Sequence, residues 1–303
     1  MLKKLFWALG ALVIFIGGAY LFAVYQNNRD LPYPRHGQIQ QQREKAIQWL
    51  VDHQRQILSQ TNPMLWWMIS EAQKSLPDER LTALLESYFR LNRGIRQSAW
   101  GPLFGERPRP YLGAFSVVAM PYYNQHFIYA LNCAEGIAED LSVVAAQNDA
   151  GFCHQANYIY RPACTTHQLM GIHFLSSGQC NLLADIDTVT WALQEDIVFQ
   201  LSWDVRVVDV YLQRVLMLLV TGAQSSVKPV WLQQVLAHQL PDGGWGDFDP
   251  LIPLPGAGYL GYSSRILSIG QPASSFHATA QGVYILSWLQ AAGASSGKTG
   301  ITP

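Results

Sequence analysis

Two histidines hold similar places in the sequence, and their side chains could transfer protons. His167 and His277 each stand near the start of an apolar segment with helical periodicity. Imidazole titrates close to neutral pH, so a histidine at the mouth of a cavity can act as a general acid or base. A histidine at a helix start is also often a simple local hydrogen-bonding group. Both residues are therefore catalytic candidates with a structural alternative.

A row of polar residues crosses an otherwise apolar segment at i, i+4, i+7 and i+11, and it consists of Ser202, Arg206, Asp209 and Gln213. This spacing predicts that the four residues lie on one face of an otherwise apolar helix. If that face lines a cavity, Asp209 is a catalytic carboxylate, and Arg206 and Gln213 bind a ligand. In the alternative, the row faces outward and the Arg–Asp pair only supports the helix.

The chain contains four cysteines, an even number: Cys133, Cys153, Cys164 and Cys180. In an oxidising compartment an even set predicts disulfides. We expect Cys153–Cys164, which would close a loop of about 12 residues and stabilise the fold by about 3 kcal/mol. Free or buried thiols remain an alternative. So does a metal site, because Cys153-His154 and Cys164-Thr-Thr-His167 offer thiolate and imidazole ligands.

The first 25 residues predict a membrane anchor. Lys3 and Lys4 precede Leu5–Tyr25, an uncharged stretch of about the 20 residues that span a bilayer as a helix. The lysines favour a cytoplasmic N-terminus. A cleaved signal peptide is the alternative, but its apolar core is usually shorter. We expect a single-pass protein of the inner (cytoplasmic) membrane with most of its chain in the periplasm.

Helical periodicity dominates the rest of the chain, and no hairpin dipeptide separates alternating apolar runs. The sequence therefore predicts an all-α fold of nine or ten helices, among them one long helix or two over Tyr122–Gln147. Asn62-Pro63 is a predicted helix start. The expected organisation is a cytoplasmic N-terminus, an anchor, a linker, an extracytoplasmic domain and a flexible tail: residues 1–4, 5–25, 26–37, 38–292 and 293–303.

One pattern occurs twice. "AQNDAGFC" is followed after a gap by "ACTTHQLMGIHFL", and "HQLPDGGWGD" by "SSFHATAQGVYIL". Each copy has a Gln, an Asp-x-Gly-aromatic turn and a second helix, with Gly171 matching Gly282. Repeated helical hairpins are what a closed ring or a solenoid requires.

The turn in "QLPDGGW" has a physical explanation. Gly243 and Gly244 can take positive φ after a helix end, and Asp242 can accept hydrogen bonds from nearby amides. Gln239 can bond an exposed helix end, and Trp245 can pack over the turn. We expect Trp245 to be a structural staple. An exposed Trp245 would instead be a ligand-binding surface.

This motif, Gln239-Leu-Pro-Asp242-Gly-Gly-Trp245, resembles the QW repeat of the terpenoid cyclase and protein prenyltransferase superfamily. The match covers about seven residues well and the helix after the loop loosely, with "DAGF" as a degenerate second copy. The resemblance implies an α/α toroid, in which helical hairpins form a ring around a central cavity. It also implies that the motif stabilises its turn.

The same superfamily suggests a role for Asp187. Asp185-Ile-Asp187-Thr188 looks like a truncated DxDD motif of class II terpene cyclases, in which a protonated aspartic acid protonates an alkene. Thr188 stands where the last aspartate of that motif would be. Asp187 is a catalytic candidate on this resemblance. In the simpler alternative, Asp185 caps a helix that begins at Ile186.

The long segment Phe248–Ser274 separates the DGGW turn from the His277 helix. It has many prolines and glycines but is too apolar to lie freely in water. We expect it to cover one end of the ring and part of the cavity, with His277 at its base. The alternative is that it only fills an incomplete ring.

Composition narrows the function without identifying it. The chain is 49% hydrophobic and 14% charged, its net charge is −1, and no basic stripe predicts nucleic-acid binding. No nucleotide-binding or HExxH pattern predicts a cofactor or metal. Ten tryptophans predict aromatic lining, and Asp247 follows the turn as a ligand-binding candidate. Three functions remain open: binding of an envelope glycan, lipid or protein; envelope polysaccharide cleavage as a hydrolase or lyase; and a prenyl or terpenoid transformation.

Overall fold

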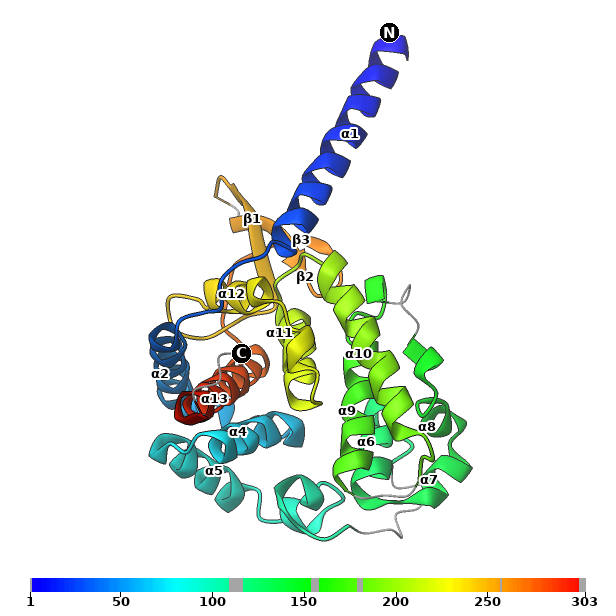
Figure 1. Ribbon diagram of the computed structural model, residues 1–303, viewed down its shortest axis with the longest axis vertical. Helices are drawn as coiled ribbons and strands as arrows, with labels where there is room; N and C mark the ends of the chain where they lie inside the picture. The colour runs from blue at the N-terminus through cyan, green and yellow to red at the C-terminus, as the bar shows by residue number, and fades with distance from the viewer. Residues whose placement is uncertain (1, 109–116, 154–157, 179–181, 257, 300–303) are drawn as a thin grey trace.

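The computed structural model describes residues 2–108, 117–153, 158–178, 182–256 and 258–299. This part of the chain is mostly helical, with thirteen α-helices and one small antiparallel sheet (Figure 1). The mostly helical prediction is confirmed.

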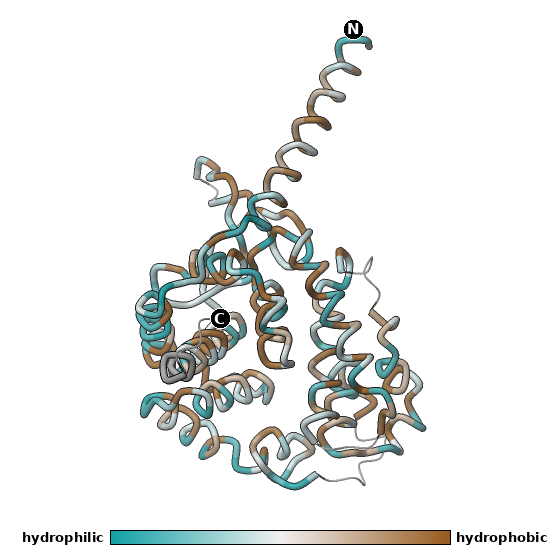
Figure 2. Tube along the Cα trace, viewed as in Figure 1, coloured by the Kyte–Doolittle hydropathy of each residue, from teal (hydrophilic) through white to brown (hydrophobic). Residues whose placement is uncertain are grey.

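The N-terminal helix α1 (Leu2–Asn27) projects away from the rest of the molecule (Figure 1). Its segment Phe6–Asn27 has a mean hydropathy of 2.1 and is long and apolar enough to cross a membrane, and it is exposed except near its end, where Asn27 is buried. Figure 2 shows hydrophobic colour along most of its length. It is the single such helix among the described residues.

After a short connection, the chain forms a first group of helices: α2 (His36–Asp52), α3 (Gln54–Ile57), α4 (Pro63–Ser75) and α5 (Glu79–Leu91). The predicted cap at Asn62 is confirmed, because its side chain accepts the Met64 N–H at 3.0 Å. Asp78 caps α5 in the same way through the Arg80 N–H. A second group consists of α6 (Tyr122–Asn132), α7 (Glu135–Asp140), α8 (Ser142–Ala146), α9 (Cys164–Ser177) and α10 (Ile186–Trp203).

Three more helices connect the two groups: α11 (Asp209–Val220), α12 (Pro229–Ala237) and α13 (Phe276–Thr299). Helix α13 packs against α2, α4 and α11, while α11 also contacts α9 and α10. The core therefore runs through α11 and α13, whose facing side chains are almost all buried. Because α13 ends at Thr299, part of the predicted flexible tail, residues 293–303, is helical. Short 3-10 helices occupy Ile95–Gln97, Gly101–Phe104, Ala150–Cys153 and Gln224–Ser226.

The predicted single helix carrying all four polar residues of the row is wrong. Helix α10 ends at Trp203 and α11 begins at Asp209. The break is stabilised by Asp204, whose carboxylate receives two hydrogen bonds from Arg206 at 2.6 Å each. Arg206 therefore lies in the connection and not on the face that carries Asp209 and Gln213.

The prediction of a chain without a sheet is also wrong. Segment Phe248–Ser274 contains three antiparallel strands in the order β1 (Phe248–Leu254), β2 (Gly258–Ser263) and β3 (Leu267–Gly270). Prolines in β1 obscured the pattern, but they lie on an edge strand, where a missing N–H is tolerated. Gly256 and Gly258 take φ of +69° and +90° at the β1–β2 turn, as few other residues could.

The two copies of the repeated pattern form similar turns, which we call the first turn (Gln147–Cys153) and the second turn (Gln239–Gly246). In the second turn, Gln239 donates to the carbonyls of Gln42 in α2 and Gly243, both at 2.8 Å. Trp245 is 1% exposed and donates its indole N–H to the Val235 carbonyl at 2.7 Å. The predicted staple is confirmed. The alternative of an exposed ligand-binding surface at Trp245 is excluded by this burial.

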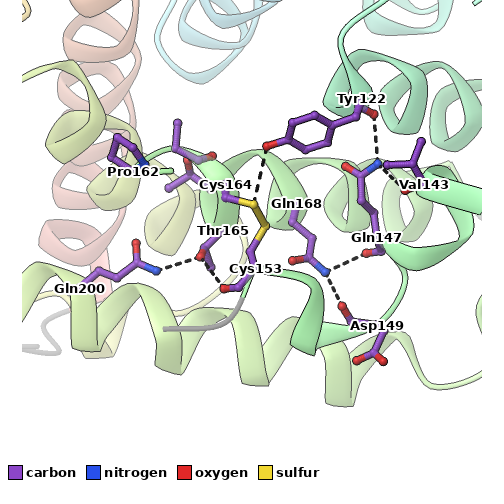
Figure 3. The surroundings of a disulfide bond; sticks show 12 residues. Tyr122, Val143, Gln147, Asp149, Cys153, Pro162, Cys164, Thr165, Gln168 and Gln200 are labelled. Atoms are coloured by element: carbon purple, nitrogen blue, oxygen red, sulfur yellow. Dashed lines mark hydrogen bonds between the residues drawn. A yellow bond between two sulfur atoms is a disulfide. The ribbon is translucent and has the colours of Figure 1, made fainter. Parts of the chain in front are cut away.

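The first turn is closed by a disulfide between Cys153 and Cys164, as predicted (Figure 3). Gln168 of α9 reaches back across it and donates to the carbonyls of Gln147 and Asp149 at 2.8 and 2.7 Å. No cysteine is free among the described residues, and no group of three or more potential metal ligands occurs in them. The disulfide removes Cys153 and Cys164 as thiolate ligands, and His154 and Cys180 lie outside the described residues.

Candidate functional site

A cavity of about 660 Å³ lies between the N-terminal ends of α9 and α13, and we call it the main cavity. Its size is within the usual range of small-molecule sites. Segments from six parts of the chain form its wall: Tyr122 and Tyr123 of α6, Tyr160–Cys164, His167 of α9, Asp209, Val210 and Gln213 of α11, Asp247 with Ser263–Ile266, and His277 of α13.

Asp209 and His277 form the polar centre of this cavity. The Nδ1 atom of His277 lies 3.3 Å from Oδ2 of Asp209. The other carboxylate oxygen accepts the Ser264 hydroxyl and, at 2.7 Å, the Val210 N–H. Burial alone would raise the pKa of Asp209, but its bonds to His277, Ser264 and Val210 together lower it. Asp209 is therefore a carboxylate held by protein donors, at a helix N-terminus that favours negative charge.

The second nitrogen of His277 also has a protein partner. Nε2 lies 3.2 Å from the amide nitrogen of Gln281, one turn further along α13. An amide N–H donated to Nε2 fixes the ring proton on Nδ1, where Asp209 accepts it. Both ring nitrogens of His277 and both oxygens of Asp209 are therefore engaged within the protein.

His167 forms the other side of the cavity. Its ring stacks on Tyr123, with centroids 4.4 Å apart and an interplanar angle of 15°. Burial, together with the nearby His277, lowers its pKa to about 4. His167 is thus a neutral, partly exposed ring in the wall at neutral pH.

Gln213 presents an open donor to the cavity. Its side-chain oxygen accepts the Thr166 hydroxyl at 3.0 Å. The residue lines the cavity, and its amide nitrogen has no hydrogen-bond partner among the described residues. A fixed amide with a free N–H pair is a recognition group for a ligand oxygen.

Charges and aromatic rings stand around the opening. Arg161 and Arg265 are exposed and both positively charged, and the Arg161 guanidinium also lies over the Tyr122 ring at 5.1 Å from its centroid. Tyr160 and Asp247 are exposed on the same rim. These groups can contact an anionic or hydroxyl-rich ligand that is larger than the cavity itself.

Two smaller cavities adjoin the first. One of about 140 Å³ shares His167, Gln213 and His277 with it, and one of about 290 Å³ also contains His277 and is bordered by Trp49. His277 is therefore a common boundary of all three spaces.

A buried ion cluster supports the site from behind. Arg214 is fully buried and donates to Asp204 at 2.8 Å, to Gln200 at 3.1 Å and to the Pro162 carbonyl at 3.2 Å. Burial would raise the pKa of Asp204, but the two arginines lower it. Arg206 in turn donates to the Ser264 carbonyl at 3.1 Å. The cluster thus fixes two segments of the cavity wall, because Arg214 binds the Pro162 carbonyl and Arg206 binds the Ser264 carbonyl.

The sequence candidates fall into two sets. His167, His277, Asp209, Gln213 and Asp247 all line the main cavity. Arg206 acts behind it, and Trp245 is buried in the second turn. Asp187 is exposed and lies at the start of α10, about 25 Å of helix from the end that leads to Asp209.

The residues at the start of α10 do what the simpler alternative expects. Asp185 accepts the Thr188 N–H at 3.3 Å as the cap of α10. Asp187 occupies the first turn, where its charge favours the helix. Neither residue lines any of the cavities described above.

Sequence reasoning missed Ser264, Arg161 and Arg265. The wall segment Ser263–Ile266 belongs to the turn between two strands that were not predicted. A comparison of the chain with protein-family models, with curated proteins and with solved structures gave no match.

Proposed function

We propose that this protein is a membrane-anchored binding protein whose domain holds an envelope ligand in the cavity between α9 and α13. One observation carries the proposal. The candidate acid and base, Asp209 and His277, have their polar atoms engaged by protein partners, whereas the amide nitrogen of Gln213 has no hydrogen-bond partner among the described residues and faces the cavity. The open groups are suited to recognition and the engaged groups to holding the site in shape.

The anchored arrangement rests on α1. Its apolar length fits one bilayer crossing, and the exposed Lys3 and Lys4 favour a cytoplasmic N-terminus. A domain in the periplasm would meet the oxidising conditions that a Cys153–Cys164 disulfide requires. A reporter enzyme that works only after export, fused after Pro303, should be active. Activity of a reporter that works only in the cytoplasm would contradict this orientation.

We further propose that the helices form an α/α toroid. The support is internal: two turns of the same pattern each precede a helix that helps to line the main cavity. A QW-like motif is compatible with that architecture, and Gln239 and Trp245 make the stabilising contacts expected of it.

The wall chemistry favours a ligand with rings and hydroxyl or acidic groups, such as a peptidoglycan fragment. Tyrosine faces suit sugar rings, and Gln213 and the arginines suit oxygen acceptors. The test is calorimetric titration of the detergent-solubilised full chain with a disaccharide-peptide from peptidoglycan. Gln213→Ala should weaken binding about tenfold, the effect of about 1.4 kcal/mol from one lost hydrogen bond.

Gln48→Ala, a change on the exposed face of α2, is the matched control and should leave the affinity unchanged. Equal affinities for wild type and Gln213→Ala would remove the cavity from the proposal. No measurable binding of any envelope glycan would remove the ligand class.

A second candidate is an envelope polysaccharide hydrolase or lyase. It is favoured by the gathering of Asp209, His277, His167 and Tyr123 around one cavity. Catalysis would require Gln281 to release Nε2 of His277. Release of new reducing ends from peptidoglycan by wild type but not by Asp209→Asn or His277→Gln would favour the enzyme over the binding protein. The prenyl or terpenoid reaction has no comparable support, since Asp187 lies outside the cavity.

A further inference from the structure

The sheet presents an apolar face to its surroundings. Ile252 pairs with Leu260 and Leu260 with Ile269, so the three form one row across the strands. Ile252 and Ile269 are 53% and 63% exposed. In β3, Leu267 and Ile269 are the exposed residues, and Ser268 and Gly270 are the less exposed ones. A sheet facing water normally shows the opposite alternation.

The opposite face of the sheet explains this orientation. A Cβ on Gly261 would lie 2.6 Å from the Phe248 ring, and one on Gly270 would lie 3.1 Å from it. Phe248 belongs to β1, so its ring covers the two glycines on one face of the sheet, and the large aliphatic side chains of the row lie on the other face. An exposed apolar surface of this kind marks a contact with another molecule or with a membrane.

The sheet lies beside the base of α1 (Figure 1). Hydrogen bonds fix α1 to the domain there: Tyr20 donates to the Trp203 carbonyl at 2.8 Å, and Asn27 donates to the Leu201 carbonyl at 2.6 Å. Arg206, three residues after Trp203, holds the Ser264 carbonyl in the β2–β3 turn. The base of α1, the end of α10 and the sheet are thus linked by direct bonds.

The length of α1 sets the depth of the sheet and of the end of α10 relative to the membrane. At about 1.5 Å per residue, a hydrocarbon layer of about 30 Å takes up about 20 residues. Counted from Phe6, where the candidate span begins, that layer ends near Tyr25. Tyr20 is about 7 Å inside this boundary, and its partner Trp203, which is 41% exposed, therefore lies close to the boundary. Tryptophan is enriched at that level.

We propose that the apolar face of the β1–β3 sheet, together with Trp203, rests in the interfacial layer of the bilayer that α1 spans. This inference depends on the anchoring proposed above. The occupant of the face is lipid, because the rigidly docked anchor brings that bilayer to the level of the sheet. Arg265, exposed between β2 and β3, is placed to meet lipid phosphates. Since Ser263–Ile266 also form the cavity wall, the opening of the cavity lies at the membrane surface.

The experiment uses the full chain in phosphatidylcholine–phosphatidylglycerol vesicles with nitroxide-labelled acyl chains. A single environment-sensitive fluorophore is attached at Ile269→Cys or Ile252→Cys. Glu86→Cys, exposed on α5 at the end of the molecule away from α1 (Figure 1), is the control, and Phe15→Cys within α1 reports the anchor itself. We expect strong quenching at positions 269, 252 and 15, and little at position 86.

The outcomes separate the two proposals. Quenching at position 15 without quenching at 269 and 252 would overturn the membrane contact of the sheet and leave the anchor standing. No quenching at position 15 would overturn both. If labelled variants fail to fold, brominated lipids replace the nitroxides: wild type should lose more tryptophan fluorescence than Trp203→Phe, and equal losses would refute the proposal.

Discussion

The first and second turns have the same polar framework but different means of closing it. In both, the aspartate accepts the N–H two residues ahead: Asp149 from Gly151 at 2.8 Å and Asp242 from Gly244 at 3.1 Å. In both, the following helix holds the turn from an equivalent position. Gln168 of α9 donates to two carbonyls of the first turn, and Thr279 of α13 accepts the Trp245 N–H in the second. The framework thus needs an aspartate, a glycine and one polar contact from the next helix.

The closing contacts show what differs. Cys153 and Cys164 join the first turn covalently to α9 across a sequence separation of 11. At the equivalent place in the second turn, the Ser275 N–H donates to the Trp245 carbonyl at 2.8 Å, forming an isolated β-bridge. In the first turn, a bond between two side chains closes a short loop. In the second turn, backbone pairing of Trp245 with Ser275 leaves room for a long insertion between these two residues. That insertion forms the sheet and one wall of the cavity.

The largest effect should come from the aromatic staple of the second turn. Trp245→Ala should lower the free energy of unfolding by roughly 3–5 kcal/mol, because it removes a buried indole and the hydrogen bond to Val235. Trp191→Ala, at a position 63% exposed, is the control and should change it little. Denaturant unfolding of the detergent-solubilised chain measures both. Equal midpoints for the two variants would contradict a structural role of Trp245.

Loss of the disulfide should affect the first turn alone. For a loop of about 12 residues the chain-entropy estimate is about 3 kcal/mol, so Cys153→Ser with Cys164→Ser should lower stability by about that amount. Hydrogen exchange should become faster at the start of α9 while the second turn stays protected. Faster exchange in both turns would mean that they do not act as separate units.

The two turns should also differ in their response to acid. His126 packs against Gly171 where Trp245 packs against Gly282, and burial lowers the pKa of His126 to about 4. Between pH 6.5 and 4 the unfolded chain binds a proton that folded His126 does not. This contribution to stability is complete above pH 6.5 and is lost as the pH falls towards 4, by about 2–3 kcal/mol.

The variant His126→Phe should therefore show a smaller fall in unfolding free energy from pH 7 to pH 4 than wild type. His167, with a pKa also lowered to about 4, remains in both proteins and accounts for part of the shared fall. Denaturant titrations at several pH values measure the difference. Parallel pH profiles would show that His126 is not the acid-sensitive group of the first turn.

Local patterns carried most of what the sequence could predict. The caps at Asn62 and Asp185, the staple at Trp245 and the disulfide Cys153–Cys164 depend on neighbouring residues or on a short loop, and all four occur in the structure. Local patterns also indicated four residues of the main cavity. His167 and His277 were found from their place near a helix start, and Asp209 and Gln213 from their spacing along one helix face.

The predictions that failed concern features that depend on contacts between residues far apart in the sequence. The row Ile252–Leu260–Ile269 exists only through strand register, which shifts at a bulge between Pro250 and Ile252. The helix break between Trp203 and Asp209 is held by Arg206 and by contacts of Asp204 with Arg214, ten residues away. Neither alternation nor helical spacing in the sequence contains this information.

The smallest expected effect tests the glycines under each turn. A Cβ at Gly282 would lie 2.5 Å from the Trp245 ring, and one at Gly171 would collide with the His126 ring. Alanine favours a helix over glycine by about 1 kcal/mol, but overpacking costs about 1–3 kcal/mol, so both variants should lose stability. Gly136 in α7 has nothing within 4 Å of the added Cβ, and Gly136→Ala should gain stability. Since His126 belongs to α6 and Trp245 to its own turn, Gly171→Ala should also loosen α6 against α9. If hydrogen exchange in α6 is unchanged in Gly171→Ala as well as in Gly282→Ala, this last distinction between the two turns is wrong.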